Sequence, residues 1–120
     1  MFEVKSTRSR TFNEEGLRQI QEWMTTGLYE HQKDYKGIFV GNSDTETPWL
    51  EREFPFEANW IRTAERQEVS AILSETPYIV WTLDAQGTLD RDAFWRELFE
   101  TNGVMDRDAW RARYSAPSEP

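Results

Sequence analysis

Residues 37–42 read GIFVGN, an apolar tripeptide set between glycines. Short apolar runs that are bounded by turn residues are typical of β-strands. We therefore expect a strand over residues 38–40 that ends at Gly41 and Asn42. Alternating apolar and polar residues over positions 2–6 predict another strand at the start of the chain.

The residues between these two strands have the spacing of an amphipathic helix. Thr11 or Asn13 is the expected amino-terminal cap, and Gly27 is the expected terminator after about Thr26. The polar residues 28–36 fit no element clearly and allow one more helical turn. The predicted apolar face recurs at three- and four-residue intervals and consists of Leu17, Ile20, Trp23 and Met24.

Two further elements are predicted in the second half of the chain. Thr63 begins the segment TAERQEVSAILSE, which contains good helix formers and an apolar face, and Pro77 closes it. Residues 78–83 read YIVWTL and have a continuous apolar centre suited to burial on both faces of a sheet. They give the strongest strand prediction in the chain.

A short phrase occurs twice, as GTLDRDAFW at residues 87–95 and as GVMDRDAWR at residues 103–111. An EF-hand calcium loop has glycine at its sixth position and a glutamate ligand at its twelfth. Counting from the glycines puts Ala93 and Ala109 at the twelfth position, and alanine has no oxygen ligand to offer. Calcium binding is therefore a weak interpretation of the repeat.

Helix capping explains the same residues better. Aspartate N-caps accept hydrogen bonds from the first helical turn, and Asp90 and Asp106 are placed to do so. In each copy the apolar residue before the cap is spaced to pack on an aromatic residue inside the helix. We expect Leu89 to meet Phe94, Met105 to meet Trp110, and short helices over about residues 90–101 and 106–114.

The predicted order is strand, helix, strand, irregular segment, helix, strand and two helices. This order favours the α+β class, with a short sheet of about three to four strands packed by three to four helices. A chain of 120 residues with 38% apolar residues can build one compact core. We expect one domain over residues 1–115 and a disordered tail over residues 116–120.

Composition removes several classes of function. The chain has no cysteine, no glycine-rich phosphate loop and one histidine, His31, so we expect no catalytic, cofactor or metal site. No apolar stretch is long enough for a membrane span, and a cytoplasmic location is expected. The net charge of −8 disfavours direct binding to nucleic acid. The first ten residues are basic, and we expect them to form a solvated edge strand.

The irregular segment over residues 42–60 is the strongest candidate for function. It reads NSDTETPWLEREFPFEANW, with five acids against one arginine and four aromatic residues among them. It is longer than most connections in compact domains. A strand over residues 51–57, with acids on its outer face, is the alternative interpretation.

Carboxylates interleaved with aromatic rings complement basic grooves that bind nucleic acids. The sequence therefore predicts a non-catalytic inhibitor or competitor that occupies the nucleic-acid site of a nuclease or of a CRISPR or restriction effector, as phage and mobile-element anti-defence proteins do. The partner would be a basic protein, and the chain a monomer or homodimer. The alternatives are a structural subunit of a phage particle or secretion machine, and an antitoxin or immunity protein. The predicted contact residues are Asp44, Glu46, Trp49, Glu51, Glu53 and Glu57, with Asp90, Asp92, Asp106 and Asp108 as a second group.

Overall fold

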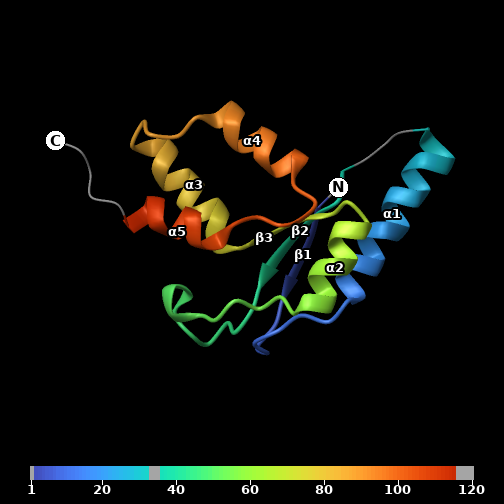
Figure 1. Cartoon of the computed structure of the whole chain (residues 1–120), viewed down its shortest axis with the longest axis horizontal. Coiled ribbons are helices and arrows are strands. Elements are labelled where there is room, and N and C mark those ends of the chain that lie inside the picture. Colours follow the sequence, from blue (N-terminus) through green and yellow to red (C-terminus); the bar gives the residue numbers. More distant parts are fainter. Residues whose placement is uncertain (1, 33–35, 116–120) are drawn as a thin grey trace.

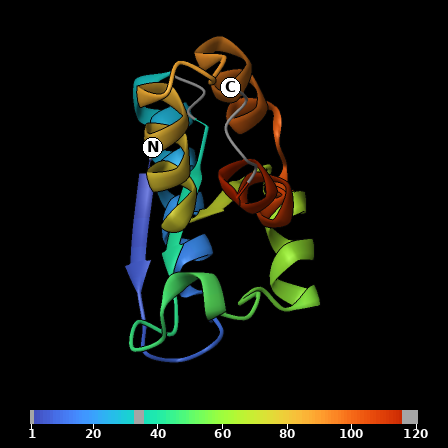
Figure 2. The same cartoon turned by 90° about the vertical axis from the view of Figure 1, so that its left-hand side faces the viewer.

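A computed structural model describes residues 2–32 and 36–115, and its centre is a parallel β-sheet (Figure 1). The four strands lie side by side in the order in which the chain makes them. They are β1 (Phe2–Ser6), β2 (Ile38–Asn42), β3 (Ser70–Leu73) and β4 (Gly103–Val104). The first two strands confirm the predictions for residues 2–6 and 38–42, and Figure 2 shows β1 at one edge of the sheet.

Helices cover both faces of the sheet, so the predicted α+β class with a small helix-packed sheet is confirmed. Two helices, α1 (Glu15–His31) and α2 (Ala58–Arg66), lie on one face. Three helices lie on the other face (Figure 1): α3 (Glu75–Ala85), α4 (Arg91–Glu100) and α5 (Arg107–Ser115). No helix in the described part of the chain is long and apolar enough to cross a membrane.

Alternation along β2 divides the apolar core into two layers, because successive side chains of a strand point to opposite faces. Phe39 points toward α1 and α2, where its ring lies 5.0 Å from that of Trp60. Ile38 points the other way, toward Ile79 on α3 and Phe94 on α4. The sheet is therefore held by a separate apolar cluster on each face.

The predicted strand over residues 78–83 is wrong, because these residues belong to α3. Ile79 and Leu83 are buried at a four-residue spacing, whereas Tyr78 and Trp81 are exposed. A short continuous apolar run does not distinguish a buried strand from a helix, so periodicity alone misassigned it. Pro77 lies in the first turn of this helix, where a missing N–H is tolerated.

The single helix predicted from Thr63 onward is also wrong. The chain forms α2 up to Arg66, turns at Glu68, whose φ is +57°, and continues as β3. All four residues of β3 are buried, so the apolar residues assigned to a helix face are those of a central strand. The short strand β4 was not predicted.

The first helix is longer than expected, and the prediction that Gly27 ends it is wrong. The helix continues to His31, and Gln32 adopts the left-handed conformation with φ +53°. The Gln32 N–H donates to the Gly27 carbonyl, so Gln32 supplies the cap. Asn13 contributes at the other end, where its Oδ1 accepts from the Glu15 N–H at 3.1 Å.

The capping interpretation of the repeat is confirmed. The Oδ1 atom of Asp90 accepts from the Ala93 N–H at 3.0 Å, and the Oδ1 atom of Asp106 accepts from the Ala109 N–H at 3.1 Å. Leu89, Phe94, Met105 and Trp110 all pack in the same apolar cluster. The predicted tail over residues 116–120 lies outside the described residues.

Candidate functional site

The carboxyl ends of β1, β2 and β3 meet at one edge of the sheet, as the parallel register requires. From there β2 connects to α2 on one face, whereas β3 connects directly to α3 on the opposite face. In open parallel sheets, ligands bind in the crevice outside the carboxyl ends of the strands. Two loops line the edge in this protein, one between β1 and α1 and one between β2 and α2.

The first loop continues β1 and is basic. Residues 5–13 read KSTRSRTFN, with three basic residues and no acid. The loop is tied to the end of β2, because the Thr7 N–H donates to the Asn42 carbonyl at 2.8 Å and the Asp44 N–H donates to the Ser9 carbonyl at 2.9 Å. Its polar side chains are therefore held at the sheet edge.

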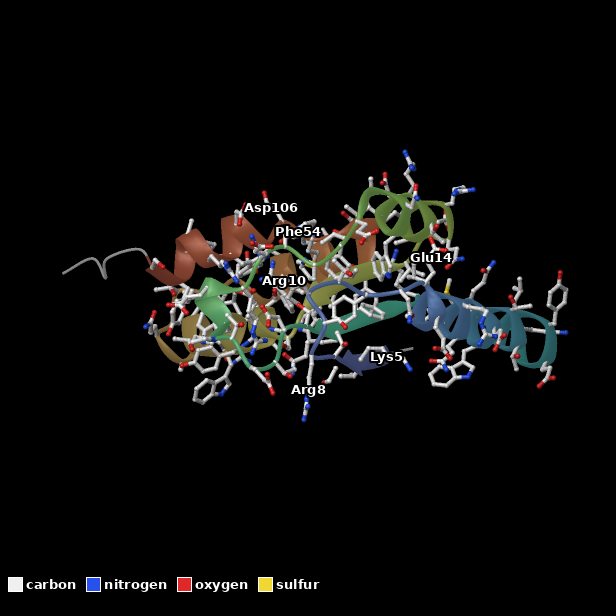
Figure 3. All side chains as sticks on the ribbon, turned by 90° about the horizontal axis from the view of Figure 1, so that it is seen from below. Lys5, Arg8, Arg10, Glu14, Phe54 and Asp106 are labelled. Atoms are coloured by element: carbon white, nitrogen blue, oxygen red, sulfur yellow. The ribbon has the colours of Figure 1, made fainter. Side chains whose placement is uncertain are left out.

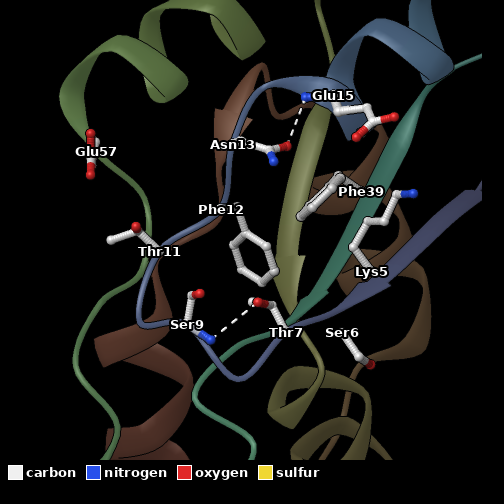
Figure 4. A pocket seen from close by; sticks show the side chains of 11 residues that line it. Lys5, Ser6, Thr7, Ser9, Thr11, Phe12, Asn13, Glu15, Phe39 and Glu57 are labelled. Carbon is white, nitrogen blue, oxygen red and sulfur yellow. Dashed lines mark hydrogen bonds between the residues drawn. The ribbon is translucent and has the colours of Figure 1, made fainter.

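A pocket of about 550 Å³ opens between this loop, β1 and the start of α1 (Figure 4). We call it the Lys5 pocket. Its floor includes Phe39 and Gly16, and a Cβ atom at Gly16 would lie 2.5 Å from the Phe39 ring. Glycine is therefore required for the close approach of α1 to β2. The polar lining residues are Lys5, Ser6, Thr7, Ser9, Thr11, Asn13, Glu15 and Glu57.

Two arginines follow Lys5 in the same loop and are exposed to solvent. The side chains of Arg8 and Arg10 are 85% and 75% exposed. Each has a carboxylate of the second loop 3.9 Å away, Glu46 for Arg8 and Glu53 for Arg10. Ion pairs this long and this exposed contribute little to stability. Arg8 and Arg10 do not line the Lys5 pocket themselves, but they alternate with Thr7, Ser9 and Thr11, which do.

The second loop is the acidic segment over residues 42–60, and the alternative prediction of a strand over residues 51–57 is wrong. It contains a 3₁₀ turn, η1 (Trp49–Glu51), and then runs extended without joining the sheet until α2 begins. Pro55 and Phe56 are buried and anchor it, and the Phe56 ring lies 4.4 Å from that of Trp60. The glutamate side chains of the loop are exposed to solvent.

The arginines near this segment turn inward. Arg52 donates to the Thr47 carbonyl and to Asn42 Oδ1, both at 2.7 Å. Arg107 is 14% exposed, donates to the Arg52 carbonyl at 3.2 Å and lies over the Phe54 ring. Their positive charges therefore fasten the segment instead of facing solvent.

Arg111 is the third arginine whose side chain turns toward the acidic segment. Its guanidinium forks onto the buried carboxylate of Glu75, at 2.6 and 2.7 Å, and also donates to the Trp49 carbonyl at 2.6 Å. Tyr114, which lies on α5 together with Arg111, packs on Trp49. A hydrogen bond with Tyr78 raises the pKa of the Tyr114 phenol above its ordinary value. The last helix thus clamps the acidic segment to the domain.

The ten predicted contact residues do not form one surface. Four glutamates of the segment are exposed at the sheet edge, whereas Asp44 is half-buried and Trp49 is half-buried under Tyr114. Asp106 and Asp108 border a hollow that is also lined by Phe54 of the segment. Figure 3 shows Asp106 near Phe54. Asp90 and Asp92 lie at the start of α4 and do not border this hollow.

Sequence reasoning missed the Lys5 pocket. The available signal is the run of lysine, arginine and hydroxyl residues over positions 5–13, although basic residues at the start of the chain also fit the predicted solvated edge strand. The strand is indeed at the edge, but its last residues and the following loop form a pocket. Comparison with known proteins finds no matching family model, no matching curated protein and no matching solved structure.

Proposed function

We propose that the protein binds a phosphate-bearing ligand in the Lys5 pocket. The observation that carries this proposal is a polar pocket at the carboxyl edge of a parallel sheet, lined by a lysine, four hydroxyl side chains and an asparagine. Lysine, arginine, serine, threonine and asparagine side chains are the groups that contact phosphate oxygens in proteins. The amino end of α1 lies at the same pocket and adds the favourable end of its dipole.

The carboxylates of the pocket restrict the ligand further. Glu15 and Glu57 line it together with Lys5, and Figure 4 shows Glu57 on the side opposite Lys5. Carboxylates repel a bare anion but accept hydrogen bonds from hydroxyl or amino groups. The pocket therefore suits an ester that carries both a phosphate and such groups, which is the chemistry of nucleotides and sugar phosphates.

Calorimetric titration with a nucleoside monophosphate, ribose 5-phosphate and inorganic phosphate tests the proposal. We expect binding of the esters that weakens with added salt, and a loss of about tenfold or more in Lys5→Gln, because a charged hydrogen bond is worth about 1.5–3 kcal/mol. Arg66→Gln is the matched control, since Arg66 is exposed at the far end of α2. Equal binding by both variants, or no binding by the wild type, would overturn the proposal.

A second candidate function is supported by the inward arginines. Because Arg52, Arg107 and Arg111 bond to the protein itself, the outer face of the segment presents its acids to solvent. This arrangement supports binding to a basic protein surface, as expected for an inhibitor or competitor that occupies a nucleic-acid site.

Two double variants of acidic residues provide the test of this second candidate and its control. Joint reversal of Glu51 and Glu53 to lysine should abolish capture of a basic nucleic-acid enzyme, whereas reversal of Asp90 and Asp92 should not. Capture that resists salt and returns copies of this chain alone would favour the assembly-subunit alternative instead.

A further inference from the structure

The ring of Phe12 stands among the polar side chains of the Lys5 pocket. Phe12 is half-buried and belongs to the lining of the pocket. Figure 4 shows its ring face on, between Lys5 and Glu57. Phe39 also lines the pocket, but it is only 1% exposed and forms part of the floor. Phe12 is therefore the ring that a ligand in the pocket can reach.

The apolar core holds this ring in place. The Phe12 ring is stacked on that of Phe56, with centroids 5.6 Å apart, and meets the Phe39 ring edge-to-face at 5.3 Å. Phe56 is 5% exposed, so it supports the ring from the protein side. A Cβ atom at Gly41 would lie 2.7 Å from the Phe12 ring, so glycine at this position lets the ring lie against β2. A ring that is already fixed loses little freedom when a ligand stacks on it.

The charged residues on either side of Phe12 order the groups of a ligand. Lys5 is suited to a phosphate, whereas Glu57 accepts hydrogen bonds from N–H groups. A nucleotide carries a phosphate at one end and a flat base with N–H donors at the other. Every base has a π-face that can stack on an aromatic side chain, whereas a sugar phosphate has none. The volume of about 550 Å³ is within the range of small-molecule sites.

We propose that the ligand of the Lys5 pocket is a nucleotide whose base stacks on Phe12, with its phosphate at Lys5 and the N–H donors of the base toward Glu57. This inference rests on the proposed binding of a phosphate ester and narrows the ligand from phosphate esters in general to nucleotides. Because the stacked face is common to all bases, discrimination among bases is expected to be weak.

A series of ligands tests the stacking without any change to the protein. Calorimetric titration compares uridine monophosphate, dihydrouridine monophosphate and ribose 5-phosphate. Dihydrouridine keeps the phosphate, the ribose and the N–H donor of the base but has lost the flat aromatic ring. We expect uridine monophosphate to bind about fivefold or more tighter than either of the other two, since the stacked base supplies the difference.

Variants of this protein locate the stacking. Phe12→Leu removes the flat ring but keeps an apolar side chain against the core. Its affinity for uridine monophosphate should fall to that for ribose 5-phosphate, which should bind as tightly as it does to the wild type. Phe54→Leu is the matched control, since Phe54 is 41% exposed and borders the separate hollow beside Asp106. It should change neither affinity.

The outcomes separate this inference from the proposed function. Equal affinities for the three ligands in the wild type, or equal losses for uridine monophosphate and ribose 5-phosphate in a folded Phe12→Leu, would overturn base stacking and leave phosphate binding intact. The absence of binding by all three esters would overturn the proposed function and this inference with it. The ligand series in the wild type decides the matter even if Phe12→Leu does not fold.

Discussion

The loop after β1 and the segment after β2 share one edge of the sheet but use arginine in opposite ways. In the first loop, Arg8 and Arg10 extend into solvent and have only distant carboxylate neighbours. Beside the second, Arg107 and Arg111 are 14% and 16% exposed and bond to backbone carbonyls and to Glu75. The net charge of a segment, counted from the sequence, therefore does not reveal which of its charged neighbours are exposed to a ligand.

This difference gives the two regions different roles. The inward arginines fix the shape of the acidic segment and are expected to matter for stability. The outward arginines belong to the loop that lines the Lys5 pocket and add positive potential there, so they are expected to matter for binding. Variants that separate stability from binding therefore test whether the two groups of arginines differ in role.

The largest effect is expected at the buried clamp. Glu75→Ala leaves the Arg111 guanidinium without its carboxylate in a nearly buried position, which should lower the free energy of unfolding by about 3–5 kcal/mol. Urea denaturation measures this loss. Glu46→Ala, which removes an exposed carboxylate, is the control, and a similar small change in both variants would contradict the clamp.

The next largest loss of stability is expected at the start of α5, the helix that carries Arg111. Met105 is buried before the Asp106 cap and packs in the cluster that includes Trp110, so Met105→Ala should cost about 2 kcal/mol or more. Thermal and urea unfolding check the value. The corresponding Leu89→Ser variant should also lower the melting temperature, and an unchanged melting temperature in both would refute the staple interpretation.

A smaller effect is expected when the caps lose their side-chain oxygens. Asp90→Ala and Asp106→Ala each remove one hydrogen bond to the first helical turn, for an expected loss of about 1 kcal/mol. Asp90→Asn and Asp106→Asn keep an oxygen acceptor and should retain most of the stability. Equal losses for alanine and asparagine would argue against capping.

The outward arginines should show almost no effect on stability. Arg8→Gln and Arg10→Gln are expected to change the free energy of unfolding by less than about 0.5 kcal/mol, as is usual for exposed pairs. The same variants should weaken binding of a phosphate ester and reduce its salt dependence. A loss of stability without a loss of binding would reverse the roles assigned to the two loops.

The smallest expected effect is a pH dependence at the exposed Asp84–Arg91 pair. The hydrogen bond from Arg91 lowers the pKa of the Asp84 carboxyl below its ordinary value. A carboxyl with a lowered folded-state pKa stabilises above its unfolded pKa, about 4, and loses that contribution as the pH falls through the folded value. The stability difference between wild type and Asp84→Asn should therefore shrink below about pH 4, and a difference that grows there would contradict this sign.

Sequence patterns located the elements that carry their own local signals. The strand at 38–42 is bounded by glycine and asparagine, and the last two helices begin at aspartate caps, so each could be predicted within a few residues. Residues 70–83 carry no such signal. One apolar stretch there becomes a strand and the next becomes a helix, and only packing against β2 and β4 decides between them.

The candidate site was predicted only in part. The exposed glutamates of the acidic segment were found from composition, but the inward bonding of Arg107 and Arg111 depends on α5, which is distant in sequence. The Lys5 pocket requires α1 and β2 to approach at Gly16, and no local pattern encodes that contact. The Lys5 pocket and the inward arginine contacts therefore depend on long-range packing, which local sequence patterns do not indicate.

Backbone amide NMR during titration with a nucleoside monophosphate shows directly whether the Lys5 pocket is the binding site. If the Lys5 pocket binds the phosphate ester, the largest shifts should fall on residues 5–16 and Glu57, and Lys5→Gln should abolish them. The acids over residues 46–53 and the exposed Trp81 on α3 should shift little. Shifts confined to those other regions, or no saturable shifts at all, would mean that the Lys5 pocket does not bind the ester.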